Sequence, residues 1–286
     1  MTPIATFSLV ARDPQTGDLG IAVASKFLAV GAVVPWLEAG VGAVATQSYA
    51  NPRFGPQGLA LMKADAGMEE ILATFRRTDP GLHTRQFGMV NAKGESLSFT
   101  GNECHGWAGG KSGENFAAQG NILSGPEVID ALVDTFAALD LPFPERLCAA
   151  LLAADRAGGD RRGRQSASLT VVGAGKGYGG MDRWIDLRVD DHPDPCLELG
   201  RLLEIHRLLF EKPRDPEPLG REDIAWLQRH LARLGHYVGA TTGEWDEATE
   251  RAFRALVGIE NLEERYAGGP YLDAVALRYL RSKLGE

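Results

Sequence analysis

The chain has 286 residues, of which 44% are hydrophobic, and a formal net charge of −8 at pH 7. This length supports one large domain or two unequal ones, and the composition is that of a globular protein able to bury a core. The acidic balance argues against nucleic acid as a partner, because a protein that binds the phosphate backbone needs a basic face.

The first predicted element is a β-hairpin, with strands over Thr6–Asp13 and Leu19–Phe27 around a Pro/Gly/Asp turn. Thr6 stands at its head. A free α-amine has a pKa of about 7.7–8.0, so an N-terminal threonine can use its own amine as the base for its hydroxyl. Here Ala5 precedes Thr6, and an amide nitrogen cannot accept that proton, so the chemistry requires cleavage of the Ala5–Thr6 bond. The alternative is a threonine placed there for its β propensity.

Further elements follow from hydrophobic periodicity and turn residues. Strands are predicted at Gly31–Pro35, Val41–Gln47, Gln86–Val90, Ser96–Thr100, Ala117–Asn121, Ala167–Val172 and Arg183–Val189, and helical patterns at Arg53–Asp79, Pro126–Leu139, Pro144–Ala157 and Pro195–Phe210. Strands early, helices in the middle and strands again favour an α+β fold with two sheets between helix layers.

Five segments occur in order along this region: Thr6–Asp13, Ser25–Pro35, Gly42–Gln47, Gln119–Leu123 and Gly158–Ser166. Through them, residues 5 to about 210 resemble the DUF1028 proteins, an uncharacterised group placed in the N-terminal nucleophile (Ntn) hydrolase superfamily. The resemblance implies a four-layer αββα sandwich and no known substrate. Threonine-type Ntn enzymes often place a lysine on the next strand. Gly31–Trp36 holds none, which leaves Lys26 as the nearest candidate.

Two strand ends offer candidate donors to an oxyanion. Asn121 ends one predicted strand and Gln47 ends another, and an amide or a nearby backbone N–H there could stabilise negative charge on a reacting carbonyl. The same groups could instead satisfy turn hydrogen bonds. Hydrolysis through another hydroxyl, Ser25 or Ser48, is a third possibility, but no histidine base lies near either in the sequence.

The glycine-rich segment Gly158–Ser166 holds the candidate ligand contacts Asp160, Arg162, Arg164, Gln165 and Ser166, to which we add Ser25. Arginine suits a carboxylate or phosphate ligand. The alternative is a structural loop with an internal Asp160–Arg162 pair.

Two other motifs resemble cofactor sites. Gly175–Gly180 matches GxGxxG, but Met181–Val189 alternates like a strand, so a glycine-rich hairpin is predicted and not a dinucleotide site. Asp190–Asp194 combines carboxylates with an imidazole. Adjacent residues rarely converge on one ion, and Asp194 as the N-cap of the next helix explains much of the cluster. We therefore expect no metal and no cofactor.

Lys212–Pro218 holds three prolines and is predicted to be a stiff linker. It divides a domain over residues 1–211 from a small all-α module over 219–286, with helices predicted at Arg221–Leu234, Asp246–Val257 and Tyr271–Leu284. Ile224–Gly239, Thr242–Thr249 and Ala252–Arg254 are similar to peptidoglycan-binding-type helical domains. That resemblance implies glycan contact, and packing or dimerisation is the alternative.

Three cysteines far apart in sequence, with no visible signal peptide and no stretch as long as a membrane span, predict a cytoplasmic protein without membrane contact. A homodimer is expected for an edge-exposed sandwich. The leading functional hypothesis is an amidohydrolase acting on a small, anionic, non-peptide C–N substrate. The competing hypothesis is a non-catalytic ligand-binding or scaffold protein with a blocked nucleophile.

Overall fold

The computed structural model describes residues 6–213 and 215–285. The chain forms two compact units, one up to Leu202 and one from Leu203. This boundary lies inside the helix α5 (Pro195–Phe210), earlier than the boundary expected from the sequence. The reason is that Leu208, in the last turns of α5, belongs to the apolar core of the C-terminal unit.

The strands of the N-terminal unit are β1 (Thr6–Arg12), β2 (Leu19–Ser25), β3 (Pro35–Glu38), β4 (Gly42–Ser48), β5 (Arg85–Asn91), β6 (Ser96–Thr100), β7 (Trp107–Gly113), β8 (Phe116–Leu123), β9 (Ser166–Val172) and β10 (Arg183–Val189). Its helices are α1 (Phe54–Lys63), α2 (Met68–Thr78), α3 (Glu127–Ala138), α4 (Phe143–Arg156) and the short 3₁₀ turns η1 (Val30–Ala32), η2 (Leu82–Thr84) and η3 (Tyr178–Gly180).

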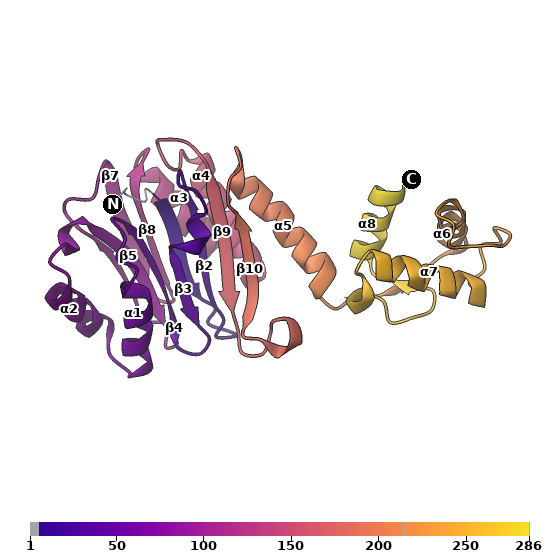
Figure 1. Ribbon diagram of the computed structural model, residues 1–286, viewed down its shortest axis with the longest axis horizontal. Helices are drawn as coiled ribbons and strands as arrows, with labels where there is room; N and C mark the ends of the chain where they lie inside the picture. Colours follow the sequence, from indigo (N-terminus) through magenta and orange to yellow (C-terminus); the bar gives the residue numbers. More distant parts are fainter. Residues whose placement is uncertain (1–5, 214, 286) are drawn as a thin grey trace. The chain divides into compact units, whose positions relative to one another are not determined.

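Within the described residues these strands form a six-stranded sheet in the order β10-β9-β2-β1-β8-β7 and a four-stranded sheet in the order β3-β4-β5-β6. Every pairing is antiparallel. The sheets face each other, with α1 and α2 against the outer side of the smaller sheet and α3 and α4 against the outer side of the larger one (Figure 1). The N-terminal unit is therefore a mixed α/β fold with antiparallel sheets.

The space between the sheets is apolar along most of its length. Val10 of β1 and Val23 of β2 pack there against Ala43 and Ala45 of β4 and against Val90 of β5. This interior accounts for the hydrophobic alternation of the first hairpin, because alternate residues of a strand point to the same face. Polar side chains replace the apolar ones near the first residue of β1.

A second apolar layer lies between the smaller sheet and its helices. Phe54 of α1 stacks on Phe75 of α2 at 4.0 Å between ring centroids, and Phe87 of β5 meets both edge-on. The single helical pattern expected over Arg53–Asp79 is thus two helices. The chain turns between them over residues 64–67, where Asp65 has a left-handed φ of 65°, and α2 then packs on the same sheet.

One other sequence expectation was wrong, and one strand was not predicted. The strand expected at Gly31–Pro35 is the turn η1 followed by β3, which begins where that strand was to end. The strand β7 was missed, because Trp107–Gly113 contains three glycines and no apolar alternation. The glycine-rich segment Gly175–Gly180, in contrast, joins the antiparallel pair β9 and β10 as predicted and leads into no α-helix.

The C-terminal unit contains the last turns of α5, the helices α6 (Arg221–Arg233), α7 (Glu247–Ile259) and α8 (Ala274–Leu284), the turn η4 (Glu263–Arg265) and the two-residue strands β11 (Glu217–Pro218) and β12 (Tyr271–Leu272). Its core gathers Leu227 and Leu231 of α6, Phe253 and Leu256 of α7, and Leu280 of α8. The expected helical region is present. In both units, every helix that the structure describes is too short or too polar to cross a bilayer.

Candidate functional site

Thr6 is the first residue of β1, which runs between β2 and β8 in the larger sheet. It pairs with Ser25 on one side and with Asn121 on the other. Its hydroxyl donates a hydrogen bond to the Ser25 hydroxyl, with 3.1 Å between the oxygens. Thr6 and Asn121 are fully buried, and Ser25 is nearly so. Three residues singled out in the sequence thus meet at one end of the sheet.

The line of β1 is continued beyond Thr6 by a different part of the chain, Gly159–Arg162, which we call the strap. On β8, Asn121 pairs with Thr6. The next carbonyl, that of Ile122, accepts the N–H of Arg161 at 3.0 Å, and Leu123 forms an antiparallel bridge with Asp160. Because β1 and the strap both run antiparallel to β8, they share one direction and lie end to end.

The strap also binds the end of β2. The N–H of Lys26 donates to Asp160 Oδ2 at 2.9 Å, and the Lys26 carbonyl accepts from Arg162 Nη2 at 3.1 Å. The Asp160 carboxylate, 6% exposed, accepts further hydrogen bonds from the backbone N and Nε of Arg162. The internal Asp160–Arg162 pair considered for this loop is confirmed at 2.9 Å. The Asp160 carboxylate thus links the strap to β2.

Neighbouring segments of the chain are held in place by Arg164, Gln165 and Ser166. Arg164 forms ion pairs with Asp155 at 2.8 Å and Asp194 at 3.2 Å. The hydrogen bond that Arg164 donates to Asp155 raises the pKa of Arg164 above its usual value. Gln165 Nε2 donates to Asp191 at 3.1 Å.

Ser166 is the first residue of β9, and its side chain binds the segment that follows β2. Its hydroxyl donates to the carbonyl of Phe27 and accepts the N–H of Val30 at 3.1 Å. In this structure Arg164, Gln165 and Ser166 therefore bind the protein's own groups, and Ser166 holds the turn that follows Lys26.

A network of uncharged polar side chains fills the space between the sheets next to Thr6. Ser8 of β1 donates to Gln47 Oε1 and accepts from Gln119 Nε2, both at 2.6 Å. Gln86 Oε1 accepts from Gln47 Nε2 and from Asn121 Nδ2, both at 2.9 Å. All five side chains are fully buried. Buried polar groups of this kind are costly unless hydrogen-bonded, and here they bond across the two sheets.

Gln47 has little capacity left for a ligand. Besides Gln86, its Nε2 donates to the carbonyl of Thr6 at 3.2 Å and approaches that of Gln119 at 3.4 Å. A side-chain amide has two N–H donors, and those of Gln47 face three acceptors inside the protein. Gln47 therefore fixes the backbone of Thr6, and an oxyanion at Thr6 would need other donors.

Sequence reasoning missed Ser8 and Gln86. A usable signal existed in β1, where Thr6 and Ser8 alternate with Phe7 and Leu9. In a strand buried on both faces, two polar residues on one face require partners from elsewhere. The partners of Thr6 and Ser8 depend on how the smaller sheet packs against β1, and no local pattern in the sequence predicts this packing.

The edge of the site beyond Asn121 is formed by Tyr49, which follows β4, and His105, which lies in the loop between β6 and β7. The Tyr49 hydroxyl is hydrogen bonded to His105 Nε2 at 3.1 Å, with the rings edge to face. The His105 carbonyl accepts the N–H of Ile122. Ser48 and Ile122 have positive φ angles of 65° and 53°, which are unusual for a serine and rare for a β-branched residue. Strained backbone of this kind tends to gather at functional sites.

Cys104, in the same loop, is not poised for chemistry. Burial raises the pKa of its thiol, although hydrogen bonding to Ser48 acts in the opposite direction. Its Sγ donates to the carbonyl of Arg85 at 3.4 Å. A thiol that stays protonated near neutral pH is a poor nucleophile.

The acidic segment Asp190–Asp194 has protein partners. Asp191 accepts from Gln165, Asp194 pairs with Arg164, and the backbone N–H of Asp194 donates to His192 Nδ1 at 3.0 Å. Over residues 6–213 and 215–285, no cluster of three or more histidine, cysteine or acidic side chains has the arrangement of a metal site.

The solved structures that match this chain include a closer and a more remote likeness. The crystal structure of protein SPO2555 from Silicibacter pomeroyi, described as DUF1028, is 31% identical, with 71% of this chain and 89% of that chain covered and a TM-score of 0.65. Anbu, an ancestral β-subunit from Yersinia bercovieri, is 12% identical, with 70% and 96% covered and a TM-score of 0.33. The second likeness is too weak to support an argument.

Family models match both units. The model described as "Putative peptidoglycan binding domain" matches residues 208–280. The model described as a family of unknown function, DUF1028, matches residues 6–199 and so spans the larger sheet, the smaller sheet and the strap. No curated protein matches the chain. With its N-terminal unit matched from the first residue of β1, the chain belongs to the DUF1028 family.

Proposed function

We propose that the N-terminal unit is an Ntn-type amidohydrolase on an αββα sandwich, with Thr6 as the nucleophile after cleavage of the Ala5–Thr6 bond. Ala5 lies outside the described residues. The observation that supports the proposal most is the strap. Ile122 and Leu123 of β8 pair with Arg161 and Asp160, so the strap occupies the place on β8 that lies directly ahead of Thr6.

In the proposed reaction the α-amine of Thr6 is the only base. Thr6 Oγ1 adds to the carbonyl carbon of the substrate amide while its proton passes to the amine. The C–N bond then breaks as the resulting ammonium returns that proton to the leaving nitrogen. The acyl group remains as an ester on Thr6. Water, deprotonated by the same amine, hydrolyses the ester and restores the free threonine.

The described residues position these atoms. Ser25 accepts the hydrogen bond from Thr6 Oγ1 and holds the hydroxyl in one direction. Gln47 holds the Thr6 carbonyl. Asn121, paired with Thr6 across β1 and β8, is the side-chain amide proposed to face the oxyanion.

An anionic substrate is proposed because of Lys26. Its ammonium donates to the carbonyl of Arg164 at 3.1 Å, and among the described residues no carboxylate lies within ion-pair distance of it. Arg162 and Arg164 are already paired with Asp160 and with Asp155 and Asp194. Lys26 is therefore the cation best able to accept a substrate carboxylate, with Arg162 adjacent to it through the Lys26 carbonyl.

A second candidate function, ligand binding without catalysis, is favoured by burial. The Thr6 hydroxyl already has a partner in Ser25, and Thr6 and Asn121 are 0% exposed. If the Ala5–Thr6 bond stays intact, the same polar network would serve to fix the two sheets, and Thr6 would have no base.

One experiment separates the two candidates. Deleting residues 2–5 places Thr6 directly after the initiator methionine, which is removed before threonine, and intact mass confirms the new N-terminus. This chain is incubated with a β-lactone, which acylates nucleophilic hydroxyls, and the adduct is located by peptide mass spectrometry. Labelling at Thr6, retained in Thr6→Ser and absent in Thr6→Ala and in uncleaved protein, supports the hydrolase. A correctly processed chain that never reacts supports ligand binding.

For the C-terminal unit we propose contact with a peptidoglycan-type polymer. The support is the family-model match over residues 208–280. A pull-down with purified peptidoglycan, compared between the full chain and a chain ending at Leu202, tests this. Equal retention of both chains would rule out the C-terminal unit as the binding element.

A further inference from the structure

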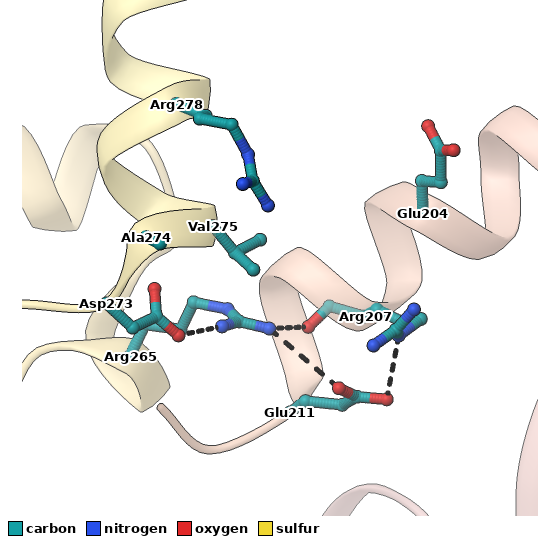
Figure 2. Close-up of a pocket in the computed structure, with 8 residues that line it drawn as sticks. All are labelled: Glu204, Arg207, Glu211, Arg265, Asp273, Ala274, Val275 and Arg278. Carbon is teal, nitrogen blue, oxygen red and sulfur yellow. Dashed lines mark hydrogen bonds and ion pairs between the residues drawn. The ribbon is translucent and has the colours of Figure 1, made fainter. Parts of the chain in front are cut away.

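A pocket of about 450 Å³ lies in the C-terminal unit, between the last turns of α5 and the start of α8 (Figure 2). Its volume falls in the range of about 300–1,000 Å³ that is typical of small-ligand sites. Six of the lining side chains are ionisable and the other two are aliphatic. They are Glu204, Arg207, Glu211, Arg265, Asp273, Ala274, Val275 and Arg278.

Four of the charged side chains form ion pairs and hydrogen bonds with one another or with nearby backbone carbonyls. Arg265, 3% exposed, forms an ion pair with Asp273, and its Nε and Nη2 donate to the carbonyls of Leu208 and Arg207. Arg207 Nε donates to Glu211 at 3.2 Å. Arg265 therefore joins the last turn of α5 to the N-cap of α8, and these four side chains form a fixed wall.

The remaining two charges stand on opposite sides of the pocket. Arg278 comes from α8 and Glu204 from α5, and Figure 2 shows them separated by the space above Val275. Both side chains are exposed, and in the part of the chain that the structure describes neither side chain has a hydrogen bond or an ion pair. Val275, 37% exposed, and Ala274 give the pocket an aliphatic surface between them.

We infer that this pocket binds a short peptide with free ends. Its carboxylate would meet Arg278, whose guanidinium suits a carboxylate, its ammonium would meet Glu204, and small side chains would pack on Val275 and Ala274. A neutral sugar chain fits less well. It would cover both charges without supplying counter-charges, which is costly, and the lining offers no aromatic ring and no neutral hydrogen-bonding side chain.

This inference goes beyond the proposed contact with peptidoglycan and does not rest on it. It is independent of the hydrolase proposal. It also differs in outcome from the pull-down. Peptidoglycan could be retained through its sugars while the pocket stays empty, and the pocket could bind free peptides in a protein that retains no peptidoglycan.

The test uses the full chain and isothermal titration calorimetry. Trialanine with free ends is compared with N-acetyl-trialanine amide, which has the same shape without the charges, and with triacetylchitotriose, a neutral sugar. We expect trialanine to bind with a Kd on the order of 0.1–1 mM, as fits a ligand of this size. The blocked peptide and the sugar should bind at least about tenfold more weakly, because each lacks charge-assisted hydrogen bonds.

Variants locate the site. Arg278→Ala and Glu204→Gln should each raise the Kd for trialanine about tenfold or more. Arg251→Ala is the control, because Arg251 is an exposed arginine of α7 outside the pocket, paired with Glu247. Equal affinity for free and blocked peptides, an unchanged Kd in both pocket variants, or no heat of binding up to 10 times the upper expected Kd would each overturn the inference.

Discussion

Replacing Gly88 by alanine tests whether the polar network between the sheets has the packing described. Gly88 lies in β5, facing the side chain of Gln119 in β8. A Cβ at this position would stand 1.9 Å from Gln119 Oε1 and 2.5 Å from its Cδ. Gln119 is fully buried and bound to Ser8, so its amide cannot move aside without losing that bond.

The magnitude follows from two contributions. Overpacking a buried site costs roughly 1–3 kcal/mol, and leaving a buried polar group without its partner costs roughly 1–3 kcal/mol more. We therefore expect Gly88→Ala to lower the free energy of unfolding of the N-terminal unit by about 2–6 kcal/mol. For a unit of this size, each kcal/mol lowers Tm by roughly 2–4 °C, so the expected decrease is on the order of 10 °C.

The assay is thermal unfolding followed by circular dichroism, with two comparisons. Gly200→Ala is the matched control in α5, where the new Cβ meets only Cys148 Sγ at 3.9 Å. This substitution should stabilise the helix by about 0.5–1 kcal/mol. In a Gln119→Ala background the obstructing amide is absent, so the cost of Gly88→Ala should fall below about 1 kcal/mol. If Gly88→Ala is equally destabilising in both backgrounds, the reasoning about Gln119 is refuted.

Three further predictions concern charged groups. Burial raises the pKa of Asp79, but hydrogen bonds from Arg85 and Asn51 outweigh it and hold the pKa below its usual value. The ionised Asp79 carboxylate therefore stabilises the fold above its unfolded-state pKa of about 3.9. This stabilisation should be lost as the pH falls through the pKa of Asp79 in the folded protein. The Tm difference between wild type and Asp79→Asn should accordingly be largest at pH 7 and shrink as the pH falls below about 3.9, and a pH-independent difference would contradict this. Asp160→Asn should cost about 1–3 kcal/mol, because the strap loses its ion pair with Arg162, and hydrogen exchange at Lys26 should accelerate, whereas unchanged exchange there would show that Asp160 does not hold the strap. Arg265→Met leaves the buried Asp273 without its ion pair and should cost about 3–5 kcal/mol in the C-terminal unit alone, as seen by calorimetry; equal destabilisation of both units would contradict the assignment.

The sequence by itself determined the local elements, because these depend on neighbouring residues. Alternation around the turn Pro14–Asp18 was enough for the β1–β2 hairpin, and the alternating run after Gly180 was enough to distinguish a strand from a nucleotide-binding helix. Helices α3, α4 and α5 begin and end within one residue of the predicted positions, since their apolar spacing persists over several turns. The family resemblance carried by five segments was likewise present in the sequence, and the family model confirms it.

Only the tertiary structure decided what surrounds Thr6. The side-chain amides of Gln47 and Gln86, from two strands of the smaller sheet, bind each other and the backbone carbonyls of Gln119 and Gly120 in the larger sheet. These groups meet because the sheets face each other with one particular register. The sequence indicates that Asp160 lies in a loop. Its place in line with β1 depends on pairing with Leu123, which lies 37 positions earlier in the chain. Periodicity reports which face of a strand is buried. It cannot report which distant side chain will lie opposite, because that contact is set by the packing of the whole unit.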